Sequence, residues 1–228
     1  MSQDIVLRSK MLRGVLLAVT GVAVIVSIAI FNRPASPPKI QGVLLSEPRP
    51  IEPFTLIDHF DRAFTKENFK GSWHLVSYGF ATCPDICPTT LSQINRMLEG
   101  IEESRYARLK VVFYTVDHKR DTPSQMANYV PYFNSDFTGL THRDDPKNLH
   151  LPFERSLGIT AKLTPRPSES DYPNPNDYDV SHGVTLFLVN PEGKLQAIFK
   201  PDINSMGYAE FDPIRLRNDY LAIRKYLG

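Results

Sequence analysis

The chain has 228 residues, of which 42% are hydrophobic, and its formal net charge at pH 7 is +1. This length accommodates one globular domain with an attached segment. The balanced charge, without a long block of like charges, argues against nucleic acid or a strongly acidic protein as the partner.

An apolar run near the N-terminus is typical of a membrane anchor. Residues 14–31 contain no charge, and eighteen helical residues at about 1.5 Å each would extend roughly 27 Å, close to the hydrocarbon thickness of a bilayer. Basic residues precede the run, so the positive-inside rule predicts residues 1–13 in the cytoplasm and the remainder of the chain exported. A cleaved signal peptide is the alternative, but no small-x-small cleavage site ends the run.

The rest of the chain reads as a linker followed by one domain. Six prolines between residues 32 and 53 predict an extended linker, and residues 54–228 then form the domain. Its predicted elements, in chain order, are a strand at 54–59, a strand at 73–80, a helix at 89–102, a strand at 109–116, a helix from 123 to about 133, a helix at 146–157, an irregular proline-rich insertion at 163–178, a hairpin of strands 184–189 and 194–199, and a helix at 213–227. This order predicts an α/β, thioredoxin-like fold with its site beyond the C-terminal ends of the parallel strands.

The two cysteines of the chain, Cys83 and Cys87, lie between the strand at 73–80 and the helix after it. Backbone N–H groups and the helix dipole at a helix start favour the thiolate form. Such a pair can form a small disulfide or bind a soft metal ion. A purely structural role is disfavoured because a disulfide closing so short a loop stabilises little. In an oxidising compartment the pair becomes a disulfide unless it is reduced or bound to metal.

His182 is the histidine that the predicted topology brings closest to the thiols, because it precedes the strand at 184–189. His118 ends another central strand and is a weaker candidate. Three others are expected at the surface: His59, His142 and His150. Two thiolates with one imidazole suit Cu(I), whereas structural zinc requires a fourth ligand. These residues leave copper binding and thiol redox chemistry both open.

Four stretches resemble one known family. They are Gly79-Phe80-x-x-Cys83-Pro84-Asp85-Ile86-Cys87-Pro88, Val116-Asp117-x-x-Arg120-Asp121-Thr122-Pro123, Phe137-Thr138-Gly139-Leu140-Thr141, and His182 followed by Phe187-Leu188-Val189-Asn190-Pro191-Glu192-Gly193. This pattern is similar to that of the Sco/SenC proteins, thioredoxin-like copper chaperones of cytochrome c oxidase assembly, and the resemblance extends from about Pro53 to Leu227.

The resemblance implies that Cys83, Cys87 and His182 bind copper, and that Asp85 and Asp117 lie near the site without binding the metal. It implies a metallochaperone rather than an enzyme, which delivers copper to the CuA site of cytochrome c oxidase. The CuA-bearing subunit and a thiol reductant or another copper carrier are then the partners. The alternative is a thiol–disulfide oxidoreductase acting through a Cys83–Cys87 disulfide on an oxidase subunit or another exported protein.

The location follows from the anchor. We expect a single-pass protein of the inner (cytoplasmic) membrane with its domain in the periplasm. A bacterial source is favoured because no Arg/Ser-rich transit segment precedes the apolar run.

Three features depart from the family pattern without removing a ligand. Thr82 stands where a histidine is common, Ser181 stands where an aspartate is common, and the insertion at 163–178 is longer than usual. We expect these differences to affect thiolate pKa, metal affinity or the choice of partner.

Overall fold

The computed structural model describes residues 14–27, 36–101, 106, 108–166 and 177–228. The chain divides into two compact units, Met1–Pro37 and Pro38–Gly228. In the first unit, residues 14–27 are helical and every side chain among them is exposed. No helix within the described ranges has both the length and the apolarity needed to cross a bilayer. The predicted cytoplasmic segment 1–13 and the end of the predicted anchor, 28–31, lie outside these ranges.

The second unit contains an eight-stranded sheet with the strand order β1-β10-β9-β4-β5-β6-β2-β3. Its strands are β1 (Gly42–Pro50), β2 (Thr55–Asp58), β3 (Ala63–Thr65), β4 (Trp73–Gly79), β5 (Leu109–Thr115), β6 (Thr138–Thr141), β9 (Leu186–Val189) and β10 (Lys194–Phe199). The strands β4, β5 and β6 are parallel, and β9 pairs antiparallel with both β4 and β10. The predicted change from parallel central strands to an antiparallel closing hairpin is confirmed.

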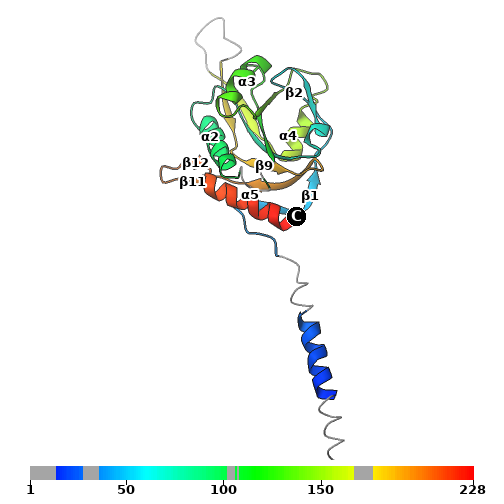
Figure 1. The fold of residues 1–228 in the computed structure, drawn as a ribbon. Coiled ribbons are helices and arrows are strands. Elements are labelled where there is room, and N and C mark those ends of the chain that lie inside the picture. The colour runs from blue at the N-terminus through cyan, green and yellow to red at the C-terminus, as the bar shows by residue number, and fades with distance from the viewer. Residues whose placement is uncertain (1–13, 28–35, 102–105, 107, 167–176) are drawn as a thin grey trace, which may run out of the picture. The chain divides into compact units, whose positions relative to one another are not determined.

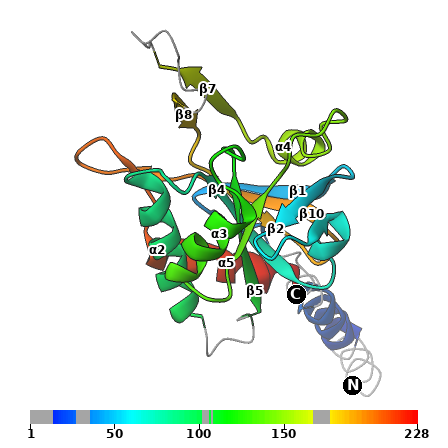
Figure 2. The same ribbon diagram turned by 90° about the horizontal axis from the view of Figure 1, so that it is seen from above.

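Helices cover both faces of this sheet (Figures 1 and 2). They are α2 (Ile86–Glu99), α3 (Pro123–Tyr129), α4 (Leu151–Leu157) and α5 (Pro213–Leu227), with 3-10 turns η1 (Lys66–Phe69) and η2 (Val130–Tyr132). Side chains of a strand alternate between faces, so Leu75 of β4 belongs to the hydrophobic cluster that includes residues of α2, α3 and α5. Its neighbour Val76 belongs to the cluster that includes residues of α4 and η1. The result is a mixed α/β, thioredoxin-like fold with a hydrophobic cluster on each side of the sheet.

Local signals set where the helices begin. Thr122 caps α3 by accepting a hydrogen bond from the backbone N–H of Gln125, and Asp212 caps α5 in the same way. A proline follows each cap, where its missing N–H has no intrahelical role. The helix α2 begins at Ile86, earlier than the predicted residue 89, because Pro88 is tolerated in a first turn. Cys87 therefore lies in the first turn of this helix.

The predicted linker at 32–53 is wrong over residues 42–50. These residues form β1, which pairs antiparallel with β10, with a register shift between Leu44 and Arg49. The strand lies at the end of the sheet order, where Pro48 and Pro50 can be accommodated because an edge strand needs ladder hydrogen bonds on one side only.

The predicted irregular insertion at 163–178 is also ordered at its ends. The strands β7 (Ala161–Pro165) and β8 (Tyr178–His182) form a two-stranded antiparallel ribbon of their own, with Ala161 opposite His182 and Pro165 opposite Tyr178. Figure 2 shows this ribbon projecting from the body of the domain. His182 therefore ends a strand of the ribbon instead of lying in a loop before the closing hairpin.

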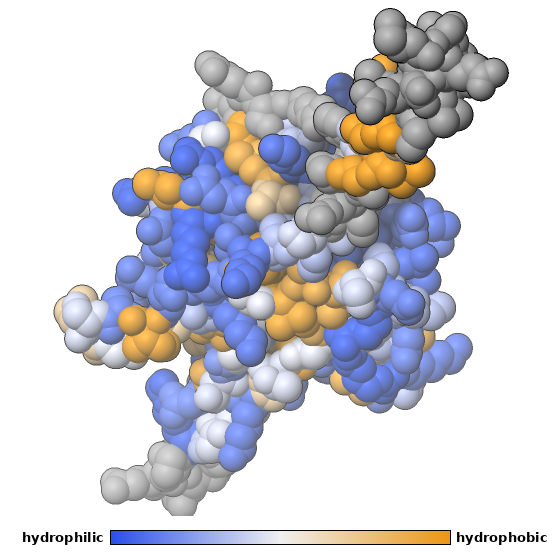
Figure 3. All heavy atoms as spheres, turned by 90° about the horizontal axis from the view of Figure 1, so that it is seen from below, coloured by the Kyte–Doolittle hydropathy of each residue, from blue (hydrophilic) through white to orange (hydrophobic). Residues whose placement is uncertain are grey.

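A second short hairpin, β11 (Asp202–Ile203) with β12 (Ala209–Glu210), precedes α5. It carries three exposed apolar side chains: Ile203, Met206 and Tyr208. On the face of the molecule seen in Figure 3, hydrophilic residues cover most of the surface and apolar residues gather in smaller patches.

Candidate metal centre

The two thiols lie where the central strand β4 passes into α2. The strand ends at Gly79, Asp85 is the N-cap of the helix and Cys87 is its second residue. Both cysteines are free and buried, with exposed fractions of 8% for Cys83 and 4% for Cys87. A side-chain carbon on Gly79 would overlap the sulfur of Cys87, so this position requires glycine for close packing of the strand against the thiol.

His182 reaches the thiols from β8. Its Nε2 lies 3.5 Å from Cys87 Sγ, and the ligand atoms of His182, Cys83 and Cys87 all lie within 4.8 Å of one another. The other ring nitrogen, Nδ1, donates a hydrogen bond to the carbonyl of Gly183 at 2.7 Å, which leaves Nε2 free to act as a ligand. The structure thus brings together the three residues selected from the sequence.

The pKa values of the two thiols are shifted in opposite directions. A hydrogen bond from Cys87 is the largest cause that lowers the pKa of Cys83 to about 4, with further hydrogen bonds from backbone N–H groups at the start of α2. The same hydrogen bond, together with burial, raises the pKa of Cys87. At neutral pH the pair therefore holds one proton and one negative charge, and a bound cation would favour release of the remaining proton.

The donor set fits copper. Across the residues that the structure describes, Cys83, Cys87 and His182 are the only three potential ligand side chains arranged so that they could hold one metal ion. Two soft sulfurs and one imidazole form a low-coordinate set that Cu(I) accepts, and the described residues supply no fourth side chain for a tetrahedral zinc site.

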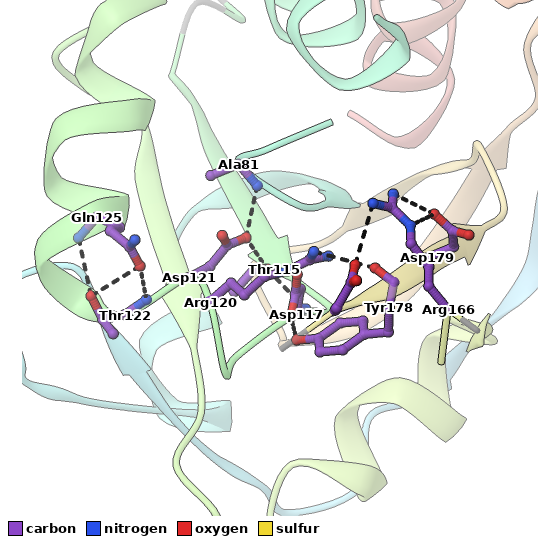
Figure 4. Close-up of polar contacts among 11 residues, drawn as sticks. Ala81, Thr115, Asp117, Arg120, Asp121, Thr122, Gln125, Arg166, Tyr178 and Asp179 are labelled. Atoms are coloured by element: carbon purple, nitrogen blue, oxygen red, sulfur yellow. Dashed lines mark hydrogen bonds and ion pairs between the residues drawn. The ribbon is translucent and has the colours of Figure 1, made fainter. Parts of the chain in front are cut away.

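The two aspartates predicted near the site differ in position. Asp85 is exposed and contributes through its backbone N–H, which donates to Cys83. Asp117 is completely buried and accepts hydrogen bonds from Arg120 Nε and from the hydroxyl of Tyr178, the first residue of β8. Asp117 is therefore connected to the ribbon that carries His182 (Figure 4).

Sequence reasoning missed two residues of this network, Arg120 and Tyr178. The guanidinium of Arg120 lies 4.3 Å from the ring centroid of Tyr178, and burial with the Asp117 hydrogen bond raises the pKa of Tyr178 to about 12, so its hydroxyl remains a donor. Arg120 stands in the same motif as Asp117, which is the signal that could have indicated it. No local signal indicated Tyr178, because it lies at the edge of the insertion.

The expectation that His59 and His142 are surface residues is wrong, and His150 is partly buried. The ring of His142 stacks between those of His118 and His150, with centroid distances of 3.9 and 3.7 Å. This stack, at the end of β6, encloses His142 between two other rings. His118 accordingly belongs to this histidine stack, and it pairs with Asp144 at 2.8 Å instead of joining the thiols.

The positions that depart from the family pattern lie at the rim of the site. Thr82 and Ser181 are both exposed, next in sequence to Cys83 and His182. Their side chains are thus available to solvent or to a partner.

A thioredoxin-like sheet with two thiols and an imidazole at the start of its first long helix defines a class of domain that binds soft metals or performs thiol–disulfide chemistry. Comparison with known proteins identifies the family. The family model described as SCO1/SenC matches residues 45–210. This chain belongs to the SCO1/SenC family, as the sequence motifs predict.

Individual relatives support the assignment of this chain to the SCO1/SenC family. The "Putative copper-binding protein" of Stutzerimonas stutzeri is 35% identical over 182 residues, covering 78% of this chain and 82% of that protein. Protein sco1 of Schizosaccharomyces pombe is 33% identical over 147 residues, covering 64% of this chain and 53% of that protein. The present chain thus spans about half the length of the Schizosaccharomyces pombe protein.

Solved structures show the same fold. Copper-bound ScoI of Arabidopsis thaliana superposes with a TM-score of 0.62 at 29% identity, covering 77% of this chain and 98% of that one. Copper-bound yeast Sco1 gives a TM-score of 0.61 at 25% identity, covering 78% and 90%.

Proposed function

We propose that this protein is a copper chaperone that binds copper through Cys83, Cys87 and His182 and delivers it to the CuA site of cytochrome c oxidase. The observation that carries the proposal is the convergence of the two sulfurs and Nε2 within 4.8 Å. Copper-bound structures of similar Sco proteins support copper as the cargo.

The site is suited to transfer because its ligands come from separate elements. Cys87 is held in the first turn of α2, whereas His182 ends a separate two-stranded ribbon and is only partly buried. Copper is the cargo, and three protein ligands leave a side open to thiolates of an acceptor. The Cys83 thiolate is available at neutral pH, and metal binding favours release of the Cys87 proton.

The proposal places the protein in the inner membrane of a bacterium. Residues 14–31 would span the bilayer, with residues 1–13 in the cytoplasm and the domain in the periplasm. The uninterrupted apolar sequence and the basic residues before it support this orientation. The partners would be the CuA-bearing subunit of the oxidase and a reductant that opens a Cys83–Cys87 disulfide before copper binds.

The test is copper stoichiometry in the reduced Pro38–Gly228 unit under anaerobic conditions. We expect one copper per wild-type chain and loss of tight binding in Cys83→Ser, Cys87→Ser and His182→Ala. Stoichiometric, tight binding that survives in Cys87→Ser would contradict the chaperone proposal.

Thiol–disulfide exchange is the second candidate, favoured by the low pKa of Cys83. In that case both cysteines would be essential for reduction of a disulfide substrate and His182 would be dispensable. Equal copper binding by the wild type and His182→Ala would favour this alternative.

A further inference from the structure

The strand β8, which carries His182, contacts the domain at both of its ends: His182 lies beside the thiols, and Tyr178, opposite Pro165 at the other end, contacts Asp117. The strands β7 and β8 pair with each other and form a sheet separate from the main one. The strand β8 runs from Tyr178 to His182, so about four residues at roughly 3.3 Å each separate its first residue from the metal ligand. The contacts of Tyr178 therefore fix the position of the first residue of β8 relative to the rest of the domain.

Tyr178 is held by two residues of the loop that follows β5, and we call these three residues the Asp117 cluster: Asp117, Arg120 and Tyr178. The Tyr178 hydroxyl donates to Asp117 Oδ1, and Arg120 Nε donates to Asp117 Oδ2. Arg120 also donates from Nη1 to the carbonyl of Tyr178 at 3.3 Å. Both carboxylate oxygens are thus occupied, and Tyr178 is held by its backbone as well as its side chain (Figure 4).

The same loop also holds the segment that leads to Cys83. Asp121 accepts a hydrogen bond from the backbone N–H of Ala81 at 2.7 Å. The guanidinium of Arg120 lies 6.0 Å from the ring of Phe80, and this ring meets His182 edge-on at 5.6 Å. One loop therefore contacts both the chain before the first thiol and the strand that bears the histidine.

We infer that Asp117, Arg120 and Tyr178 are positioning residues, which hold β8 so that His182 Nε2 faces the two thiols. This inference rests on the proposed function. Its physical basis is that the buried carboxylate of Asp117 accepts hydrogen bonds from the guanidinium of Arg120 and the hydroxyl of Tyr178. These bonds fix β8, a strand that has no backbone pairing to the main sheet. Loss of the cluster leaves both thiols in place but lets His182 move away from them.

The test compares Tyr178→Phe and Asp117→Asn with a matched control, Tyr114→Phe, in the full-length reduced chain. Tyr114 is a buried tyrosine on β5 whose hydroxyl donates to the Glu154 carboxylate at 2.6 Å, so the control removes the same type of hydrogen bond elsewhere. Three quantities are measured: contacts of the His182 ring by NMR without copper, Cu(I) affinity by competition with a chromophoric chelator, and the urea midpoint.

In both cluster variants we expect the NMR contacts between the rings of His182 and Phe80 to be lost without copper. Cu(I) affinity should fall about 10- to 100-fold, as is usual when the support of a metal ligand is removed. Tyr114→Phe should lower the urea midpoint while leaving both His182 readouts at wild-type values. If a cluster variant does not fold, Arg120→Lys is the replacement, since it keeps the positive charge but loses the Nε donor to Asp117.

Wild-type contacts between His182 and Phe80 in folded cluster variants would overturn the inference, as would an equal loss of affinity in Tyr114→Phe. A wild-type chain that binds no Cu(I) would refute the proposed function instead. The NMR measurement without copper would still decide whether the cluster positions His182.

Discussion

Cys83 and Cys87 share one proton, and this arrangement defines what the pair can bind. The thiolate of Cys83 is stabilised by donors that include the Cys87 thiol itself, so the second ionisation requires a compensating positive charge. A soft cation supplies that charge. Close packing supports the arrangement, because Gly79 leaves the space that the Cys87 sulfur fills.

Gly79→Ala should disturb the metal centre directly. The added carbon would overlap Cys87 Sγ and also lie 3.3 Å from a ring carbon of Phe113, so β4 or α2 must shift. Overpacking of this kind costs about 1–3 kcal/mol. We expect a lower urea midpoint together with weaker Cu(I) binding.

Gly100→Ala is the matched control for this substitution. Its added carbon would meet mainly the side chain of Arg217, which is flexible and can move away. Wild-type Cu(I) affinity in Gly79→Ala would show that the thiol does not depend on this close approach.

At the scale of elements, the sheet separates the two thiols from a group of buried polar side chains around Tyr114. The thiols belong to the cluster that packs with α2, α3 and α5, whereas Tyr114 of β5 belongs to the opposite cluster. There the Tyr114 hydroxyl contacts His142 Nδ1 at 3.1 Å, at the end of β6. Burial, followed by the neighbouring His118 and His150, lowers the pKa of His142 to about 3.

His142 should make the domain less stable in acid. An unfolded histidine titrates near pH 6.5, so between about pH 6.5 and pH 3 the unfolded chain binds a proton that the folded chain excludes at this residue. The free energy of unfolding should therefore fall as the pH decreases through this window, by up to about 1.4 kcal/mol per pH unit for one proton.

Urea unfolding of His142→Gln at several pH values between 5 and 8 measures this effect. The variant should show a shallower pH dependence, by up to about one proton. Some dependence should remain, because burial lowers the pKa of His74 to about 4. An unchanged slope in His142→Gln, equal to that of the control Lys147→Gln at an exposed position, would contradict the prediction.

At the scale of the molecule, the chain consists of a short N-terminal unit and a domain that contains its own core. Both hydrophobic clusters, and all three proposed copper ligands, lie within Pro38–Gly228. The helical residues 14–27 expose their apolar side chains throughout. The proposed membrane anchor and the proposed copper site therefore belong to different units.

Removal of residues 1–37 should release the domain from the membrane without unfolding it. In a bacterial host we expect the full chain in the membrane fraction and the Pro38–Gly228 unit in the soluble fraction when it is exported with a cleavable signal. The urea midpoint of the released unit should equal that of the domain in the detergent-solubilised full chain. Recovery of the full chain in the soluble fraction would refute the proposed anchor.

Signals from neighbouring residues were sufficient to predict the parallel central strands, the starts of the helices at 123 and 213, and the thiols at the start of α2. These features depend on side-chain periodicity and on hydrogen bonds within one turn, so a short stretch of sequence contains the cause. The family motifs likewise indicated Cys83, Cys87 and His182.

Other features depended on residues far apart in the chain. The contact between Tyr178 and Asp117 joins residues 61 positions apart, and that between Cys87 and His182 joins residues 95 positions apart. The strand β1 exists because β10 offers it a partner, and His142 is buried because His118 and His150 stack against it. Only the folded chain brings such partners together, since their attraction depends on distances that no local pattern encodes.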